Sequence, residues 1–288
     1  MRSLDDNASD TQSSDQSGDQ SGDQRALEAG STGSPAPARR GEVTPTPWTF
    51  RQMVIGVTAT LIPWLTFSIG SLALFGSSTP TAKPPSVTID AISGVVVFLV
   101  SALLEAIFLI APLLVVFSRK LPRAPFRERM RWLGFRSTPL APALLVIVVG
   151  LVIGLGGSVL YSQLVAILHL PLQTNTDTLL QEGKSAPLTT LGILAAAAFV
   201  APVCEEIFFR GLLFTGLLKR MSLWPSVVLS AIIFGVSHAD VGSLVPLIII
   251  GLALAWARWR TDSLWPGIII HTVNNTAAAV VLLPLLLK

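Results

Sequence analysis

The chain has 288 residues, of which 51% are apolar and 13% are charged, and its formal net charge is +3 at pH 7. A soluble globule of this size needs much more polar surface, so the composition excludes one and indicates an integral membrane protein. The positive charge does not favour a nucleic-acid partner, because the basic residues lie beside the apolar segments, where such residues contact anionic membrane lipids.

Residues 1–47 differ in composition from the rest of the chain. They hold eight of the 17 acidic residues, no aromatic side chain and a repeated Asp-Gln-Ser-Gly motif between Asp15 and Gln24. Such a segment cannot bury enough apolar surface to offset the entropy lost on ordering, and it lacks the apolar centre of a signal peptide. We therefore predict a disordered cytoplasmic tail over 1–47 and a transmembrane helical domain over 48–288.

Apolar runs predict about seven membrane-spanning helices, since roughly 20 helical residues cross the hydrocarbon core of a bilayer. The runs cover residues 53–76, 91–118, 141–168, 188–218, 222–240, 244–257 and 264–286. The run at 188–218 is long enough to tilt or protrude, whereas 244–257 is short for a span. The predicted fold is an all-α, polytopic transmembrane helix bundle.

The distribution of Lys and Arg predicts the orientation of these spans, because cytoplasmic loops are enriched in basic residues. Basic residues precede the first span and follow the fourth and sixth spans, and seven of them lie in the loop 119–136. The alternate loops carry only Lys83 and Lys184. This pattern predicts a multi-pass protein of the cell membrane, plasma or inner, with a cytoplasmic N-terminus.

Three ionisable residues lie within the fourth apolar run: Glu205, Glu206 and Arg210. A charged side chain at the centre of a transmembrane helix costs roughly 2.5–3.5 kcal/mol, so these groups must pair or line a polar cavity. Glu206 and Arg210 are four residues apart and share one helix face, which predicts an ion pair. Glu205 then remains free for proton transfer. The alternative is that all three residues have a purely structural role in helix packing.

Two of the three histidines lie in later apolar runs, each one helical turn from a residue that can fix its imidazole ring. Phe234 and His238 are four residues apart, and so are His271 and Asn275. One such histidine alone is better explained by helix packing. Two of them near the membrane depth of Glu205 predict a convergent site.

Glu105 is the one charged residue in the second apolar run. A carboxylate that faces lipid is expensive, so we expect Glu105 to face the interior of the bundle. We hypothesise that it supports the site, either by sharing Arg210 with Glu206 or by hydrogen bonding into the same cavity. A buried protonated carboxyl group without that role is the alternative.

Three short motifs follow one another along the chain. They are Glu-Glu-x-x-x-Arg at 205–210, Phe-x-x-x-His at 234–238 and His-x-x-x-Asn at 271–275. Together they resemble the CaaX protease and bacteriocin-processing family of intramembrane proteases, also called the Abi family, over about 190–280. The resemblance implies an endopeptidase that acts on a peptide or a lipidated protein. It also implies a catalytic cavity formed by Glu205, His238, His271 and Asn275, with Glu206 and Arg210 in support.

Two hydrolytic mechanisms fit these residues. In the first, Glu205 and His238 activate a water molecule, while His271 and Asn275 donate hydrogen bonds to the developing oxyanion. In the second, His238, His271 and Glu205 bind Zn²⁺, which activates its bound water. The His-Glu-x-x-His motif of soluble zinc proteases is missing, and the single cysteine, Cys204, excludes a multi-cysteine metal site. We favour the glutamate mechanism.

Other classes of function remain open at this point. A proton-coupled transporter would also place Glu105, Glu205, Glu206 and Arg210 along an intramembrane path, but no inverted repeat is visible in the sequence. A non-catalytic membrane scaffold or an immunity protein would not need all three motifs intact. A rhomboid-type serine protease needs a Gly-x-Ser-Gly nucleophile motif, and the sequence at 156–159 does not match it.

Overall fold

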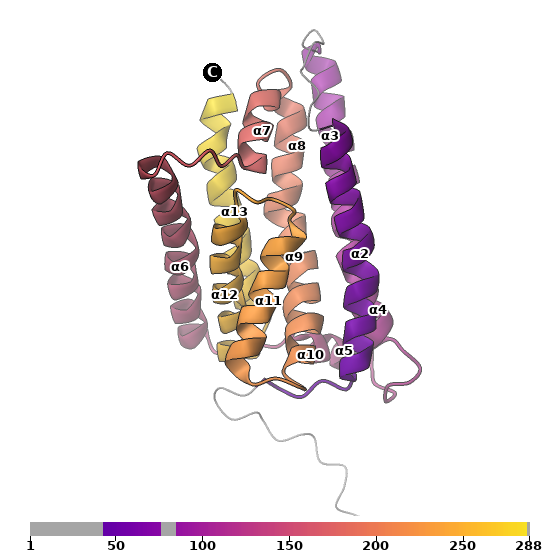
Figure 1. The fold of residues 1–288 in the computed structure, drawn as a ribbon. Helices are drawn as coiled ribbons and strands as arrows, with labels where there is room; N and C mark the ends of the chain where they lie inside the picture. Colours follow the sequence, from indigo (N-terminus) through magenta and orange to yellow (C-terminus); the bar gives the residue numbers. More distant parts are fainter. Residues whose placement is uncertain (1–42, 76–84, 287–288) are drawn as a thin grey trace, which may run out of the picture. The chain divides into compact units, whose positions relative to one another are not determined.

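Apolar helices make up most of the described chain, which comprises residues 43–75 and 85–286 of the computed structural model (Figure 1). The helices are α2 (Phe50–Phe75), α3 (Val87–Glu105), α4 (Ile107–Val116), α5 (Phe126–Leu133), α6 (Leu140–Ile167), α7 (Asn175–Gly183), α8 (Pro187–Ala195), η1 (Ala196–Val200), α9 (Ala201–Glu205), η2 (Glu206–Phe214), α10 (Thr215–Leu217), α11 (Leu223–Ser237), α12 (Leu244–Thr261) and α13 (Trp265–Leu286). No strand occurs among these residues, and the predicted all-α class is confirmed. The predicted disordered tail falls on residues 1–42, outside the described residues, apart from its last positions 43–47.

Within the described residues, six stretches of helix are long and apolar enough to cross a membrane. They are Phe50–Ser71, Val87–Val116, Leu140–Ile167, Pro187–Leu217, Leu244–Thr261 and Trp265–Leu286. The helix at the predicted fifth span, α11, has only 15 residues, although the apolar run covers 222–240. The sixth span is longer than expected, because α12 continues to Thr261. The polytopic helical fold is therefore confirmed, with a short fifth helix.

α11 ends at Ser237 because the backbone of the next two residues leaves the helical path. The His238 N–H bonds the carbonyl oxygen of Gly235, three residues back, at 3.3 Å, and Ala239 adopts a φ of 51°. A residue in that left-handed region ends a right-handed helix. Alanine is the strongest helix former, so the apolar run alone could not predict this end.

The second span consists of two helices. α3 ends at Glu105 and α4 begins at Ile107, with Ala106 in a turn between them. After the turn, the Leu109 N–H bonds the carbonyl oxygen of Ala106 at 3.0 Å, a tighter i→i−3 step than an α-helical bond. Glu105, expected midway along one helix over 91–118, therefore lies at a helix end.

The fourth span winds as a π-helix over two stretches, η1 and η2. A π-helix closes i→i+5 hydrogen bonds, so its side chains point in directions that an α-helical wheel does not predict. η2 begins at Glu206, directly after Glu205, and all nine of its residues are buried. Such wide turns occur frequently at functional sites.

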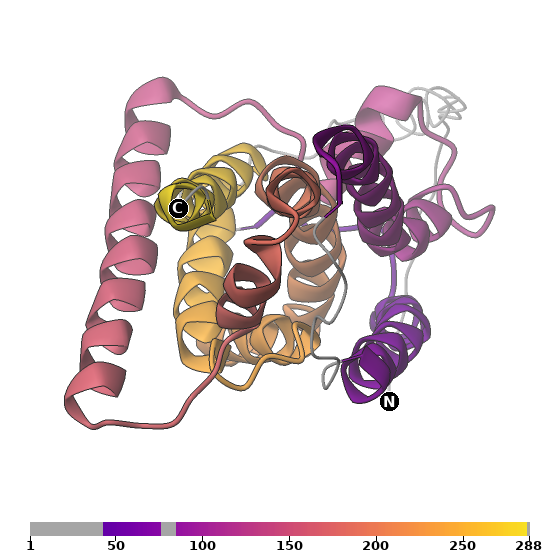
Figure 2. The same ribbon diagram turned by 90° about the horizontal axis from the view of Figure 1, so that it is seen from above.

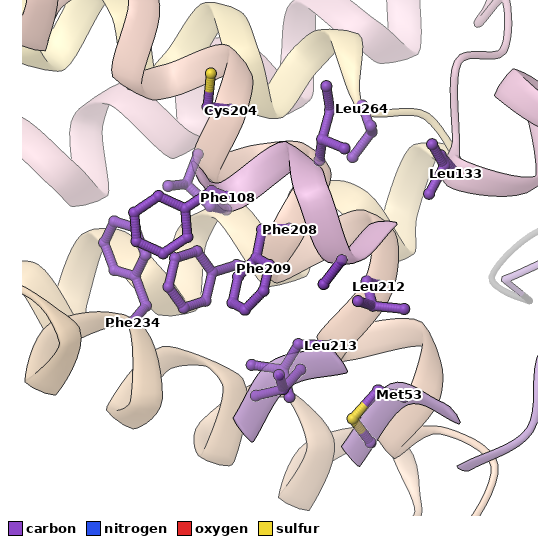
Figure 3. Close-up of a cluster of buried hydrophobic side chains, with 14 of the residues drawn as sticks. Met53, Phe108, Leu133, Cys204, Phe208, Phe209, Leu212, Leu213, Phe234 and Leu264 are labelled. Carbon is purple, nitrogen blue, oxygen red and sulfur yellow. The ribbon is translucent and has the colours of Figure 1, made fainter. Parts of the chain in front are cut away.

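A cluster of aromatic rings packs beside η2 (Figure 3). The ring centroid of Phe108 in α4 lies 5.2 Å from that of Phe208 and 5.7 Å from that of Phe209. Phe209 in turn lies 5.2 Å from Phe234 of α11, edge to face. Aromatic pairs in such arrangements add about 0.5–1.5 kcal/mol beyond the burial of their area. The cluster joins α4, η2 and α11 around the segment that carries the motif residues.

α3 and α8 cross at close range, and the crossing includes a helix cap. A Cβ added at Gly94 would meet the carbonyl group of Leu188, and one added at Gly192 would meet the backbone of Gly94. Asp90 of α3 is buried and accepts hydrogen bonds from the backbone N–H groups of Leu188 and Thr189, both at 2.9 Å. A side chain of one span therefore caps the start of another, which the sequence analysis did not foresee.

Asp90→Ala is expected to lower the free energy of unfolding by about 1–3 kcal/mol, because it leaves two partly buried N–H groups of α8 without their partner. Thermal unfolding of the detergent-solubilised protein measures this change. Ser86→Ala is the control, since Ser86 caps α3 at an exposed position through a 3.4 Å bond from the Ile89 N–H. The control should be much less destabilised. An Asp90→Ala protein as stable as the parent would show that the cap contributes nothing.

Residues 43–48 are tied to the end of the bundle that carries the basic loop. The Thr44 N–H donates to Asp262 Oδ1 at 3.2 Å. Arg136 donates to Asp262 Oδ2 at 3.0 Å, and Arg258 donates to Oδ1 at 2.6 Å. Burial lowers the pKa of Arg136, and the charge of Asp262 opposes that effect. One carboxylate therefore connects the segment before α2 with the loops that flank α6 and α12.

The predicted orientation is tested by labelling with a membrane-impermeant thiol reagent added outside intact cells. Glu128→Cys in α5 should be shielded and Lys184→Cys between α7 and α8 should react, because basic loops remain cytoplasmic. Both positions are exposed, whereas the native Cys204 is 4% exposed and adds little background. The opposite labelling pattern would invert the orientation.

Candidate active site

Residues from three helices meet around the carboxylate of Glu205, the last residue of α9. His238, directly after α11, places Nε2 at 3.9 Å from Glu205 Oε1. His271 of α13 places Nε2 at 3.7 Å from Oε2. Oε2 has no hydrogen-bond partner among the described residues, and the Glu205 side chain is only 9% exposed. Two imidazole rings thus face the two oxygens of one buried carboxylate, and an unsatisfied buried group of this kind calls for a functional explanation.

The tautomer of neutral His238 follows from its backbone contact. Nδ1 lies 2.8 Å from the carbonyl oxygen of Phe234. A carbonyl oxygen only accepts, so Nδ1 carries the proton, and Nε2 of the neutral ring holds a lone pair. The side chain is 28% exposed, and Nε2 is the atom nearest Glu205. His238 can therefore accept a proton on the side that faces Glu205.

Glu206 and Arg210 form a fully buried ion pair, as their spacing predicts. Arg210 Nη1 donates to Glu206 Oε1 at 2.7 Å, and neither side chain has exposed surface. Nη2 of Arg210 donates to the carbonyl oxygen of Gly251 in α12 at 3.2 Å. His271 Nδ1 lies 3.5 Å from the same Glu206 oxygen. The pair connects η2 with α12 and α13 directly behind Glu205.

Phe234 contacts the cation and both imidazole rings. Arg210 Cζ lies 4.4 Å from the ring centroid of Phe234. The ring also meets His238 and His271 edge-on, with centroids 4.8 and 5.6 Å apart. A cation over an aromatic face is attracted by the ring quadrupole, and edge-to-face contacts restrict ring rotation. Phe234 therefore holds both imidazoles in place beside Glu205.

Asn275 bridges α13 and η1 with its amide group. Nδ2 donates to the carbonyl oxygen of Ala197 at 2.9 Å, and Asn274 Nδ2 donates to Asn275 Oδ1 at 3.4 Å. An amide nitrogen carries two hydrogens, so one N–H of Asn275 remains for a further acceptor. The contacts place this amide one helical turn from His271, on the side of η1.

Glu105 faces the site, but it does not share Arg210. Its Oε2 is buried without a hydrogen-bond partner among the described residues, and its electrostatic neighbours are Glu205 and Cys204. Arg210 donates to Glu206 and to a backbone carbonyl instead. The hypothesis of a shared Arg210 is thus corrected, because α3 ends at Glu105 beside α9, which carries Glu205.

Trp64 of the first span contributes a contact that the sequence analysis missed. Its Nε1 donates to the carbonyl oxygen of Ser237 at 2.9 Å, and its ring lies 4.9 Å from that of Phe108. The bond satisfies a carbonyl at the end of α11, directly before His238. The sequence does show a tryptophan in a membrane span, and its N–H needs an acceptor. Which group accepts the hydrogen bond depends on how α2 packs, so the sequence alone does not identify it.

The nitrogen and oxygen atoms around Glu205 can be compared with the ligands of a zinc site. Such a site needs three or more ligand atoms about 2.0–2.2 Å from the position of the ion. His238 and His271 face different oxygens of Glu205. Across 43–75 and 85–286, no group of three or more His, Cys, Asp or Glu side chains is placed to hold a metal ion. The arrangement does not fit the three-ligand zinc alternative, and no step proposed below depends on a metal.

A family model matches the part of the chain that forms this site, and two known proteins match part of the chain. The model of the type II CAAX prenyl endopeptidase Rce1-like family matches residues 187–277. "Putative membrane peptidase YdiL" of Bacillus subtilis is 30% identical over 102 residues, which cover 35% of this chain and 40% of that protein. An uncharacterized protein of Mycoplasma capricolum is 29% identical over 143 residues, 44% of this chain and 40% of that protein. No solved structure matches the chain.

The chain spans about two fifths of the length of each of these relatives. The family match runs from α8 into α13 and contains all three motifs, from Glu205 to Asn275. Glu105 and Trp64 lie outside it. With both histidines and the buried ion pair inside the matched segment, this part of the chain is similar to the type II CAAX prenyl endopeptidase Rce1-like family.

Proposed function

We propose that the protein is an intramembrane endopeptidase that hydrolyses a peptide bond near the membrane surface. The observation that supports it best is the position of His238 and His271, whose Nε2 atoms face the two oxygens of Glu205 at 3.9 and 3.7 Å. A carboxylate between two imidazoles inside an apolar bundle can act in general acid–base catalysis with a water molecule. The relative named as a membrane peptidase supports a peptide as the substrate class, and the match to a CAAX prenyl endopeptidase family supports a lipidated protein.

In the first proposed step, Glu205, assisted by Nε2 of His238, takes a proton from a water molecule. The water oxygen attacks the carbonyl carbon of the peptide, a C–O bond forms, and the π electrons move to the carbonyl oxygen. His271 and the second N–H of Asn275 donate hydrogen bonds to this oxyanion. Separations near 4 Å in a substrate-free site typically tighten once the substrate is bound.

In the second step, the proton held between Glu205 and His238 passes to the peptide nitrogen. The oxyanion collapses, the C–N bond breaks, and the amine leaves. Glu205 returns to its starting carboxylate, so it acts as base in one step and as acid in the next.

Three other side chains act in this proposal as positioning residues. Glu206 and Arg210 fix η2 against α12 and α13, and Phe234 restricts both imidazole rings. Glu105 supports the site as a second carboxyl group beside Glu205. The placement in the cell membrane with a cytoplasmic N-terminus belongs to the same proposal and is tested by the labelling experiment above.

The histidines provide the test of this function. In liposomes with an internally quenched peptide library, His238→Ala should lower kcat/KM about 100-fold or more, because removal of a positioned acid–base group typically costs 10²–10⁴ in rate. His169→Asn is the control: His169 has a φ of 51°, which asparagine tolerates, and it makes no contact with Glu205 in the site. An equal loss in both variants would contradict the assignment.

A further inference from the structure

α11 is too short to cross a bilayer, and this leaves space between its neighbours. Its 15 residues rise about 22 Å, less than the roughly 30 Å of the hydrocarbon core. The connection from α11 to α12 therefore lies below the ends of α6 and α8 (Figure 1). α6 runs along one side of the bundle against α12 and α13 (Figure 2).

A cavity of about 510 Å³ borders this connection. One wall is α6, with Ser158, Tyr161 and Ser162. The segment that leads into α7 forms the second wall, and Gly242 with Ser243 forms the floor. Cavities of roughly 300–1,000 Å³ are the size that small ligands or a few peptide residues occupy.

Most polar side chains of the cavity present hydrogen-bond acceptors to a ligand, whereas the hydroxyl groups of Thr176 and Ser243 can also donate. Ser158 and Ser162 each donate their hydroxyl hydrogen to a carbonyl oxygen of α6, at 2.9 and 2.8 Å. Tyr161 donates its own to the carbonyl oxygen of Gly242 at 2.8 Å. A hydroxyl that donates elsewhere has only lone pairs left for a ligand. Asp177 adds a carboxylate, and no Lys or Arg is among the described lining residues.

One wall and the floor of the cavity continue towards the candidate active site. Gly242 follows His238 by four residues. On α6, a Cβ added at Gly154, one turn before Ser158, would lie 3.2 Å from Asn274 Oδ1. Asn274 in turn donates to Asn275. The cavity therefore borders the loop that follows His238, and its α6 wall packs against α13, which carries Asn275.

The floor of the cavity is held in one conformation. A Cβ added at Gly242 would collide with the carbonyl group of Gln173, so the two loops touch through their backbones. Ala239 has a φ of 51°, a strained conformation for alanine. Strained backbone persists where the surroundings fix it, and such positions gather at ligand sites. The backbone contact with Gln173 and the hydrogen bond from Tyr161 hold Gly242 against both walls.

We propose that this cavity binds the substrate residues that flank the scissile bond, and that it prefers N–H-rich or basic residues over acidic ones. Its acceptor oxygens match the N–H groups of an extended peptide, an amide side chain or a lysine. An aspartate or glutamate would meet lone pairs and the carboxylate of Asp177, with no cation to pair with. The inference rests on the proposed peptidase function and adds a substrate preference to it.

Two internally quenched peptides that the parent protein cleaves, identical except for Lys or Glu beside the scissile bond, test the preference. The parent should show a kcat/KM about tenfold or more higher for the Lys peptide. Removing two acceptors with Ser158→Ala and Ser162→Ala together should reduce this ratio to about threefold or less. These small substitutions add no volume, so the comparison does not depend on a variant that disturbs the fold.

A second set of variants tests occupancy of the cavity. Ser162→Leu fills space and should raise KM for the Lys peptide about tenfold while kcat changes less than about threefold, because binding is lost and the chemistry is not. Val159→Leu is the control, since Val159 lies on the same helix and is 58% exposed. An unchanged ratio in the serine double variant, or an equal KM in Ser162→Leu and Val159→Leu, would overturn the cavity proposal.

The two proposals fail in different ways. If hydrolysis depends on Glu205 but is indifferent to the cavity variants, the peptidase function stands and the cavity proposal is overturned. If hydrolysis by the purified protein survives Glu205→Gln, the proposed function is overturned, whatever the cavity variants do.

Discussion

Glu205→Gln is expected to abolish peptide hydrolysis, with kcat lowered about 10³-fold or more, while the protein remains folded. The amide has nearly the volume of the carboxyl group, but it cannot take a proton from water. The fold should persist, because the separations from Glu205 to His238 and His271, 3.9 and 3.7 Å, exceed hydrogen-bond distance. The lost group therefore matters for chemistry far more than for packing.

The measurement is hydrolysis of a quenched peptide by purified protein in liposomes, together with its melting temperature. Glu128→Gln is the matched control, since it makes the same chemical change at an exposed position in α5. Its activity should equal that of the parent. Normal turnover by Glu205→Gln would refute the catalytic assignment.

Glu206→Gln should destabilise the protein by about 3–5 kcal/mol, because removal of one partner from a buried ion pair leaves the other charge uncompensated. Arg210 has no exposed surface, and Glu206 is its only carboxylate partner by hydrogen bond among the described residues. Thermal unfolding should report a large decrease in melting temperature, with activity lost in parallel. A Glu206→Gln protein as stable as the parent but inactive would mean that the two glutamates have exchanged roles.

The cause of that instability is checked by removing the partner charge as well. The double variant Glu206→Leu with Arg210→Met should recover most of the lost stability, because replacing both members of a buried pair with apolar residues is frequently neutral or stabilising. Activity should stay low, since Arg210 also lies 4.4 Å from the Phe234 ring that contacts both histidines. A double variant as unstable as Glu206→Gln would show that a stranded charge is not the cause.

The apolar runs predicted the bundle because a membrane span needs a long stretch of apolar residues, and that property is local to the sequence. The positions at which these helices break are not determined by the local sequence alone. Ala106 and Ala239 mark the interruption of the second span and the end of α11, and neither residue is a helix breaker. The end of α11 depends partly on Trp64, which donates to Ser237 from another helix.

The candidate site was predictable wherever spacing along one helix determines it. Glu206 and Arg210 meet because residues four apart remain neighbours, even where the chain winds as a π-helix. The acceptor of Asn275 and the neighbours of Glu105 lie on helices distant in sequence, so spacing could not identify them. The cap on α8 from Asp90 was missed for the same reason.

Single-turnover cleavage in water enriched in ¹⁸O tests the claim that Glu205 activates water directly. With excess purified protein and a peptide that it cleaves, mass spectrometry locates the heavy oxygen in the product and in the protein. Direct attack by water predicts one heavy oxygen in the new C-terminal carboxyl group of the product and none in Glu205. Heavy oxygen in the Glu205 side chain would reveal a covalent acyl intermediate on that residue and contradict the account.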